Sequence, residues 1–188
     1  NFKKSGKWIY AYGDNYAQGD YYIACAADSI FINPMGAVEI TGLSATTQFY
    51  KGLLDKLGVE MQIIKVGTFK SAVEPYILTE MSEPSRLQQQ QYLGNIWGYI
   101  SSDIAAMRKV TVEDVNNWAD SIVITETAQS YIPRKIVDGL AYRHEVESKM
   151  KALCGIDKSE DINVITPSEY LGAENLLNPD NSNNSIAI

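Results

Sequence analysis

The sequence predicts an α/β protein with a mainly parallel sheet flanked by helices and followed by a helical region. Two observations lead to this class. In the first third of the 188 residues, short runs of β-branched and aromatic side chains alternate with helical patterns, as is typical of βαβ units around a parallel sheet. From Ser82 onward the apolar positions recur at helical spacing over long stretches.

Three strands and two helices are expected in the first third. Residues 7–12, 29–32 and 59–66 are short apolar runs bounded by turn residues, and they predict strands. Asp14 or Asn15 is expected to cap a helix that continues through Ala27. Thr46 begins a second expected helix, which Gly58 ends from the position after its last turn.

The remainder is predicted to be largely helical. Residues 83–108 form a long Gln-rich helix, whose expected buried positions are Leu87, Tyr92, Ile96, Tyr99 and Ile100. Thr111 and Asp114 have the spacing of a capping box, which predicts a helix to residue 119. Further helices are expected over 128–136 and 143–153, followed by a last strand over 161–166.

Composition excludes several classes of function. Lys and Arg total 16 against 23 Asp and Glu, a net charge of −7, so the surplus of positive charge expected of a nucleic-acid-binding protein is missing. The longest apolar run, residues 21–27, is far shorter than the roughly 20 residues that span a bilayer. Cys25 and Cys154 do not have disulfide or metal-site spacing, and His144 is the single histidine. We therefore expect neither a metal nor an organic cofactor.

The segment around Lys70 is the main candidate for chemistry. It follows an expected strand, and the ends of parallel strands carry reactive groups in open α/β folds. A lysine acts as a general base only when neutral, which requires burial that lowers its pKa; Phe69, Val73 and Tyr76 could supply an apolar setting. Ser71 and Glu74 lie close enough in sequence to hydrogen-bond or pair with Lys70.

Spacing alone favours a less specific interpretation of Lys70, because most single lysines after a strand are solvated surface charges. A self-contained dyad of Lys70 with Ser71 is also disfavoured. Neighbouring side chains diverge by about 100° on a helix and point to opposite faces of a strand. If Lys70 is a base, its nucleophile lies elsewhere.

The glycine turn between Gly13 and the following helix could place backbone amides as an oxyanion or phosphate site. Neither a P-loop nor a G-x-S-x-G turn is present, however. The spacing by itself favours a tight connection from strand to helix.

Five segments together resemble signal peptide peptidase A of the long protease IV type, specifically its amino-terminal repeat. They are residues 10–14 (YAYGD), 17–22 (AQGDYY), 33–36 (NPMG), 49–58 (FYKGLLDKLG) and 66–75 (VGTFKSAVEP). The resemblance covers nearly the whole chain, and the last segment is the most specific. It implies two tandem ClpP/crotonase-like repeats, of which the first supplies a general-base lysine and the second a nucleophilic serine. Lys70 matches that lysine.

The chain departs from the pattern of the second repeat at Gln18. There the family has an Ala-Ser-Gly-Gly-Tyr type of motif, whereas residues 17–21 here read AQGDY. Glutamine has no nucleophilic oxygen, so the resemblance implies that this repeat cannot form an acyl-enzyme alone and that the isolated chain is inactive. Ser71 is the candidate for orienting the lysine.

The resemblance also implies a domain plan and partners. Residues 1–171 are expected to form the first repeat, incomplete at its start, 172–185 a polar linker, and 186–188 the opening of a second repeat. The implied whole is a serine peptidase with a Ser-Lys dyad that degrades cleaved signal peptides. The resemblance further implies that this peptidase is a homo-oligomer at the bacterial inner membrane, with its catalytic domain outside the cytoplasm.

Two other functions remain open from the residues. The chain could be a non-catalytic scaffold repeat of the same architecture, in which Lys70 is structural. It could also be a crotonase-type acyl-CoA enzyme, although no CoA pocket or acidic pair is evident. The segment 66–75 favours the peptidase.

Overall fold

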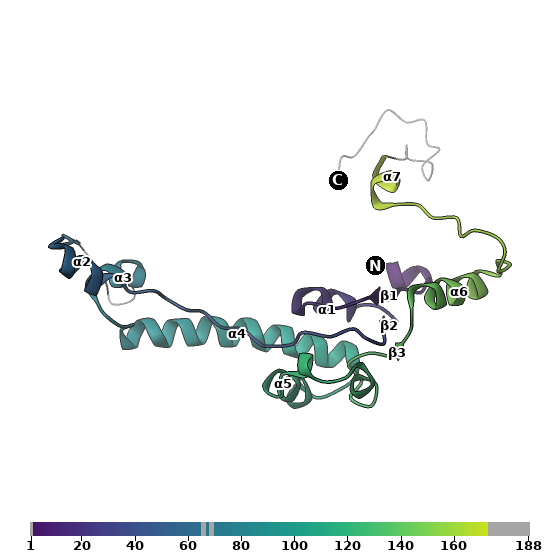
Figure 1. The fold of residues 1–188 in the computed structure, drawn as a ribbon, viewed down its shortest axis with the longest axis horizontal. Helices are drawn as coiled ribbons and strands as arrows, with labels where there is room; N and C mark the ends of the chain where they lie inside the picture. Colours follow the sequence, from purple (N-terminus) through teal and green to yellow (C-terminus); the bar gives the residue numbers. More distant parts are fainter. Residues whose placement is uncertain (1, 65–66, 68–69, 173–188) are drawn as a thin grey trace. The chain divides into compact units, whose positions relative to one another are not determined.

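The computed structural model describes residues 2–64, 67 and 70–172 (Figure 1). The chain divides into two compact units, Asn1–Val146 and Glu147–Ile188. The first contains the sheet and most of the helices, and the second contains most of α6 and all of α7.

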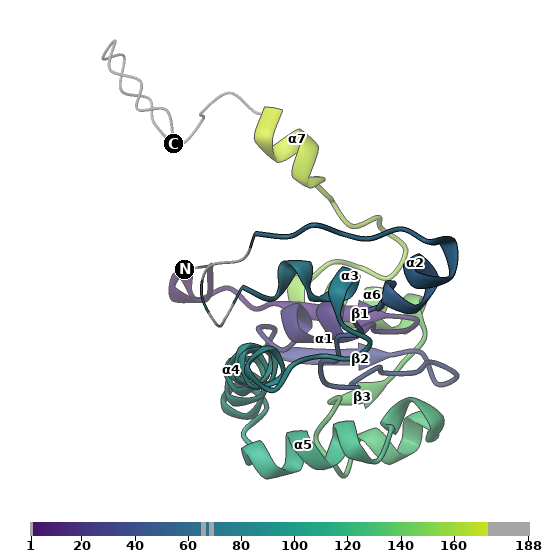
Figure 2. The same cartoon turned by 90° about the vertical axis from the view of Figure 1, so that its left-hand side faces the viewer.

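Three parallel strands form the centre of the first unit. They are β1 (Tyr10–Gly13), β2 (Ser29–Ile32) and β3 (Gly139–Leu140), in the order β1-β2-β3 (Figure 2). Tyr10 pairs with Ser29, and Phe31 pairs with Gly139. The predicted α/β class and parallel sheet are confirmed. The β3 strand was missed because two residues are too few to show an alternating pattern.

Helix α1 (Gln18–Ala24) lies between β1 and β2 in the chain and contributes buried side chains to the core. Tyr21 is fully buried, and its hydroxyl donates a 2.8 Å hydrogen bond to the Ile136 carbonyl just before β3. Cys25 is buried among apolar side chains, and burial raises the pKa of its thiol to about 11. Cys25 is thus part of the core.

The expected cap of this helix is wrong. Ala17 occupies the cap position, and no side chain bonds the first turn. Asn15 instead accepts a hydrogen bond from the Ala37 amide, and Asp14 accepts one from Asn33. Both side chains therefore hold the turn after β2. That turn passes so close that a Cβ on Gly36 would lie 2.0 Å from the Asp14 carbonyl oxygen.

Two predicted strands are absent from the described residues. Residues 59–64 and 161–166 are irregular, and residues 65–66 lie outside the described part. Both segments are rich in apolar side chains, but Ile64, Val164 and Ile165 are exposed. A strand is stabilised by cross-strand pairs and by burial of one face, and neither segment has these here.

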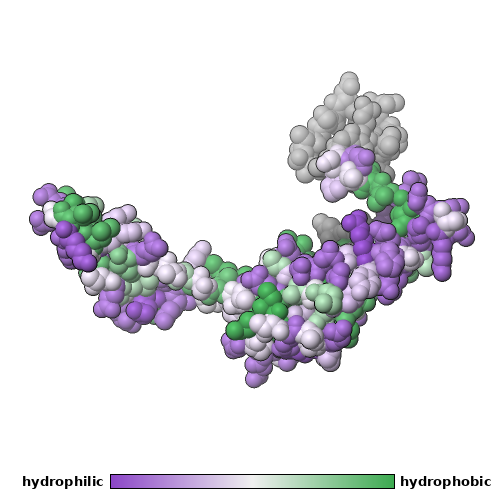
Figure 3. Space-filling model, viewed as in Figure 1, coloured by the Kyte–Doolittle hydropathy of each residue, from purple (hydrophilic) through white to green (hydrophobic). Residues whose placement is uncertain are grey.

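Helix α2 (Lys51–Leu57) begins later than the expected start at Thr46. Its predicted end is confirmed, because Gly58 adopts a left-handed conformation with φ +70°. Leu53 and Leu57 are exposed, and Figure 3 shows apolar surface over this helix.

Helix α4 has the predicted bounds, Glu83–Arg108, and Ser82 caps it by accepting a hydrogen bond from the Ser85 amide. Its buried residues lie toward its carboxyl end, where Ile104 and Ala105 join the core. The expected burial of its amino-terminal positions is wrong: Leu87, Tyr92 and Tyr99 are exposed, and Ile96 and Ile100 are half-buried.

Helix α5 (Val112–Asp120) follows, with the predicted capping box between Thr111 and Asp114. The helix expected over 128–136 shortens to a 3-10 turn at Ala128–Tyr131. Pro133 cannot donate a backbone hydrogen bond, and Lys135 has a φ of +60°, so an α-helix cannot continue through them. The short elements Phe2–Ser5 and Val123–Thr125 are also 3-10 turns.

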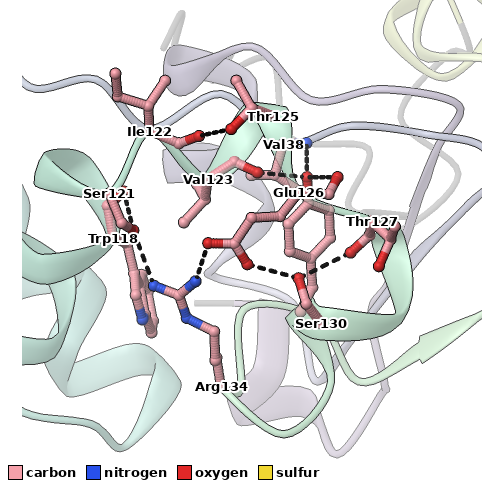
Figure 4. A network of polar contacts seen from close by, with 11 residues as sticks. Val38, Trp118, Ser121, Ile122, Val123, Thr125, Glu126, Thr127, Ser130 and Arg134 are labelled. Atoms are coloured by element: carbon pink, nitrogen blue, oxygen red, sulfur yellow. Dashed lines mark hydrogen bonds and ion pairs between the residues drawn. The ribbon is translucent and has the colours of Figure 1, made fainter.

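A network of polar contacts holds these turns (Figure 4). Arg134 donates to Glu126 at 2.6 Å and to Ser121 at 3.1 Å, and Ser130 donates to the other oxygen of Glu126. The buried Tyr131 hydroxyl donates to the Val123 carbonyl and accepts from the Val38 amide. These contacts fix the segment that leads into β3.

Helix α6 (Arg143–Cys154) confirms the helix predicted over 143–153. Its last residue, Cys154, is followed by Gly155, which has a φ of +68° and ends the helix. Helix α7 (Pro167–Gly172) is capped by Thr166 and Glu169, each bonding the other's amide. The first residue of the predicted linker over 172–185, Gly172, ends α7, and the rest of that linker and the predicted start of a second repeat lie outside the described residues.

Arg108 and Asp138 join the end of α4 to the sheet. The guanidinium donates two 2.9 Å hydrogen bonds to the carboxylate and a third, at 2.8 Å, to the Lys135 carbonyl. The same carboxylate accepts from the Ile30 amide in β2. Burial alone raises the pKa of a carboxyl group, but the hydrogen bonds from Arg108 and Ile30 outweigh it and hold the pKa of Asp138 below its usual value.

Replacing Asp138 with Ala should lower the free energy of unfolding by about 2–3 kcal/mol at pH 7, because it leaves the Arg108 cation buried without its partner. The loss should stay below that of a fully enclosed pair, since the Asp138 side chain is 38% exposed. Urea denaturation measures it, and Asp120→Ala at an exposed site is the control.

The contribution of Asp138 should also depend on pH. A carboxyl group whose pKa is depressed by folding stabilises fully above its unfolded pKa of about 3.9 and loses this effect as the pH falls through its folded pKa. The difference between wild type and Asp138→Ala should therefore narrow below about pH 4. An equal difference at pH 7 and pH 2.5 would contradict this assignment.

Candidate functional site

Lys70 lies immediately before two short helical elements. A 3-10 turn spans Ser71–Val73, and α3 (Glu74–Ile77) continues from it with Pro75 in its first turn. Proline is favoured there because its fixed φ suits a helix and its missing N–H is not needed. Lys70 therefore directly precedes a compact helical turn and does not lie within a strand.

The Lys70 side chain is exposed. Within the described residues it makes no hydrogen bond or ion pair, so Ser71 is not bonded to it. Of the side chains expected to shield Lys70, Val73 is half-buried and Tyr76 is 43% exposed. Phe69 lies outside the described residues.

Tyr50 holds one side of this turn. Its amide donates a 2.7 Å hydrogen bond to the Pro75 carbonyl. Its ring stacks on that of Tyr76, with centroids 5.9 Å apart and planes 24° apart. These contacts join the segment before α2 to the Lys70 turn.

Glu74 holds the other side. Its carboxylate accepts a 2.7 Å hydrogen bond from the Ser82 hydroxyl and a weaker one, at 3.3 Å, from the Ser82 amide. Its side chain is buried although the surrounding turn is largely exposed. Sequence reasoning noted Glu74 as a neighbour of Lys70 but missed this link to the start of α4.

An open groove of about 430 Å³ runs beside the turn. Ser71 lies on its wall, together with apolar side chains from three segments: Phe49, Ala72, Pro75, Met81 and Tyr92. Lys70 itself does not line the groove, but its sequence neighbour Ser71 does. The wall also carries the polar residues Thr47, Glu74, Ser85, Gln88 and Gln89.

Gln18, at the position where the resemblance has a serine, serves a structural role. It begins α1, and its side-chain oxygen accepts hydrogen bonds from the amides of Thr41 and Gly42 at 2.8 and 2.9 Å. Its side-chain nitrogen donates to the Gly42 carbonyl at 2.9 Å. The amide group thus closes the loop that crosses the amino end of α1.

In the described part of the chain, the ionisable and thiol groups outside the Lys70 turn offer no second candidate site. His144 is exposed and stacks on Tyr142, and Cys154 is a free, exposed thiol. Among the described residues, no three His, Cys, Asp or Glu side chains are arranged to hold a metal ion. In the same residues, no helix is both long and apolar enough to cross a membrane.

Comparison with known proteins identifies the family. A profile of peptidase family S49 matches residues 1–157. The chain is 36% identical to Protease 4 of Salmonella typhi over 166 residues, and 33% identical to Protease 4 of Haemophilus influenzae over 177 residues. It is also 26% identical over 174 residues to the chloroplastic serine protease SPPA of Arabidopsis thaliana.

The matches cover most of this chain but a small part of each relative. They include 85%, 91% and 93% of this chain, and 27%, 29% and 25% of the respective relatives. The chain thus spans less than a third of their length. The profile match, the parallel α/β sheet and the Lys70 segment agree with one another, and the chain belongs to peptidase family S49.

Proposed function

We propose that this chain supplies the general base of a serine-lysine endopeptidase and that a second repeat supplies the nucleophilic serine. The observation that carries the proposal is the Lys70 turn of an S49 chain, in which an exposed lysine directly precedes Ser71 on the wall of a mainly apolar groove. The names of the relatives, Protease 4 and serine protease SPPA, support a peptidase of this kind.

The proposed mechanism divides the chemistry between two repeats. Neutral Lys70 accepts the proton of the serine hydroxyl as the oxygen attacks the scissile carbonyl. The resulting ammonium then donates that proton to the leaving amine, and water repeats the cycle on the acyl-enzyme. Backbone amides of the repeat that carries the serine hold the oxyanion.

The exposure of Lys70 fits this division. A lysine serves as a general base only in its neutral form, which water around the amine disfavours. A second repeat that covers the turn would remove water from the amine and favour its neutral form. The same contact would bring Ser71 or another hydroxyl to orient the amine, so the base would become active only in the assembled site.

The substrates and surroundings are part of the same proposal. Cleaved signal peptides are apolar and extended, and the groove beside Ser71 has a mainly apolar wall. We propose that the assembled enzyme is a homo-oligomer at the bacterial inner membrane, with this repeat outside the cytoplasm. A scaffold role remains the second candidate, favoured by the lack of any partner for Lys70 among the described residues.

Lys70→Ala in the full-length protein should lower kcat/KM by about 10²–10⁴-fold, the usual contribution of a general base. Lys70→Arg should be as inactive, because a guanidinium does not release its proton. Hydrolysis of an apolar fluorogenic peptide measures both, and Lys56→Ala in exposed α2 is the control. Unchanged turnover in Lys70→Ala with native folding would favour the scaffold.

Gln18→Ser should not create a nucleophile, because the position serves the loop at residues 41–42. A fluorophosphonate probe should label the same number of serines per chain in Gln18→Ser as in the wild-type full-length protein, counted by mass spectrometry. Unfolding should become easier by about 1 kcal/mol as the amide's hydrogen bonds are lost. A second labelled serine, at position 18, would show that α1 carries a competent site.

A further inference from the structure

Glu74 is an unusual residue for its position. It is 2% exposed, and the only other buried polar or charged residues in the described part of the chain are Ser101 and Arg108. Its neighbours from Lys70 to Leu78 are exposed or half-buried. A carboxylate is costly to remove from water unless donors replace its hydration, so the contacts that it makes must compensate.

Two hydrogen bonds of Glu74 lead directly to the start of α4. The Ser82 hydroxyl donates to Glu74 at 2.7 Å, and the Ser82 amide donates at 3.3 Å. The same hydroxyl accepts a 3.4 Å hydrogen bond from the Ser85 amide. One serine therefore caps α4 and holds Glu74, and a hydrogen bond to a charged acceptor is about twice as strong as a neutral one.

Glu74 also organises the turn that contains Lys70. Its carbonyl accepts the Leu78 amide at 2.8 Å, which closes α3. Its backbone directly follows the 3-10 turn at Ser71–Val73, whose first flanking residue is Lys70. Movement of Glu74 relative to Ser82 would therefore move the backbone of Lys70.

We propose that Glu74 is a positioning residue, which acts through Ser82 to fix the Lys70 turn on the amino end of α4. This inference rests on the proposed function for its catalytic consequence. The Glu74–Ser82 contact, here called the clamp, is independent of the proposed function, because it concerns only how well residues 71–78 are ordered. A displacement of about 1 Å at a reacting group costs up to about 100-fold in rate, so a loose turn should slow the chemical step.

The experiment uses the full-length protein with Glu74→Gln, Glu74→Ala, Ser82→Ala and Ser82→Thr. Glu83→Gln is the matched control, because it removes a charge one residue from Ser82 at a side chain that is 88% exposed. Hydrolysis of an apolar fluorogenic peptide gives kcat and KM from pH 6 to 10. Hydrogen exchange of amides 71–78 reports the clamp without any activity.

We expect Glu74→Ala and Ser82→Ala to lower kcat about 10–100-fold with little change in KM. The pH at which kcat is half-maximal should shift, and amides 71–78 should exchange faster. The kcat of Glu74→Gln should be intermediate, and Ser82→Thr, which keeps the hydroxyl, should retain the wild-type kcat. The double variant Glu74→Ala/Ser82→Ala should lose no more activity than either single variant, because both substitutions break the same chain of hydrogen bonds.

Two results would overturn the clamp: unchanged exchange of amides 71–78 in Glu74→Ala, or an equal loss of kcat in Glu83→Gln. A fall in kcat that only follows a smaller folded fraction, measured by thermal denaturation, would make Glu74 purely structural. Failure of the proposed function has a different signature, since Lys70→Ala would then keep its activity while exchange in Glu74→Ala still increased.

Discussion

The bond between Arg108 and Asp138 is the interaction on which the arrangement of the first unit depends. A single guanidinium joins the last residue of α4 to the carboxylate that also holds the Ile30 amide of β2. The other end of α4, about 39 Å away at 1.5 Å per residue, begins at Ser82 and holds Glu74. The helix is thus anchored in the core at one end and carries the Lys70 turn at the other. Both attachments use a charged side chain whose burial is compensated by hydrogen bonds.

This arrangement separates stability from chemistry within one chain. The core is built from α1, the sheet, the carboxyl end of α4 and α5, with Tyr21, Ile30, Ile32, Ile104 and Trp118 among its buried side chains. The Lys70 turn contributes little to that core: its residues are mostly exposed, and Glu74 is its buried exception. Under the proposed function, the exposed Lys70 would need a second surface to act as a base, as a site shared between two repeats would provide.

The sequence was informative where local patterns decide structure. The bounds of β2 and α4, the end of α2 at Gly58 and the Thr111–Asp114 capping box were all predictable, because each depends on neighbouring residues. It was misleading where distant partners decide: residues 59–64 and 161–166 have strand composition but no strand to pair with, and Asp14 and Asn15 bond the β2 turn instead of capping α1. Lys70 could be singled out from its motif. The Glu74–Ser82 contact could not, because Ser82 is eight residues away and only the fold brings them together.

We propose that a neutral amine at position 70 is the base, and chemical replacement of that amine tests this role most directly. Lys70→Cys in the full-length protein should be inactive, and alkylation with bromoethylamine should rebuild a lysine-like amine there. Lys70→Ala receives the same treatment, since the exposed Cys154 also reacts. We predict recovery of peptide cleavage in alkylated Lys70→Cys alone. Complete alkylation at position 70 in folded protein, verified by mass spectrometry, without recovery of cleavage would contradict the account.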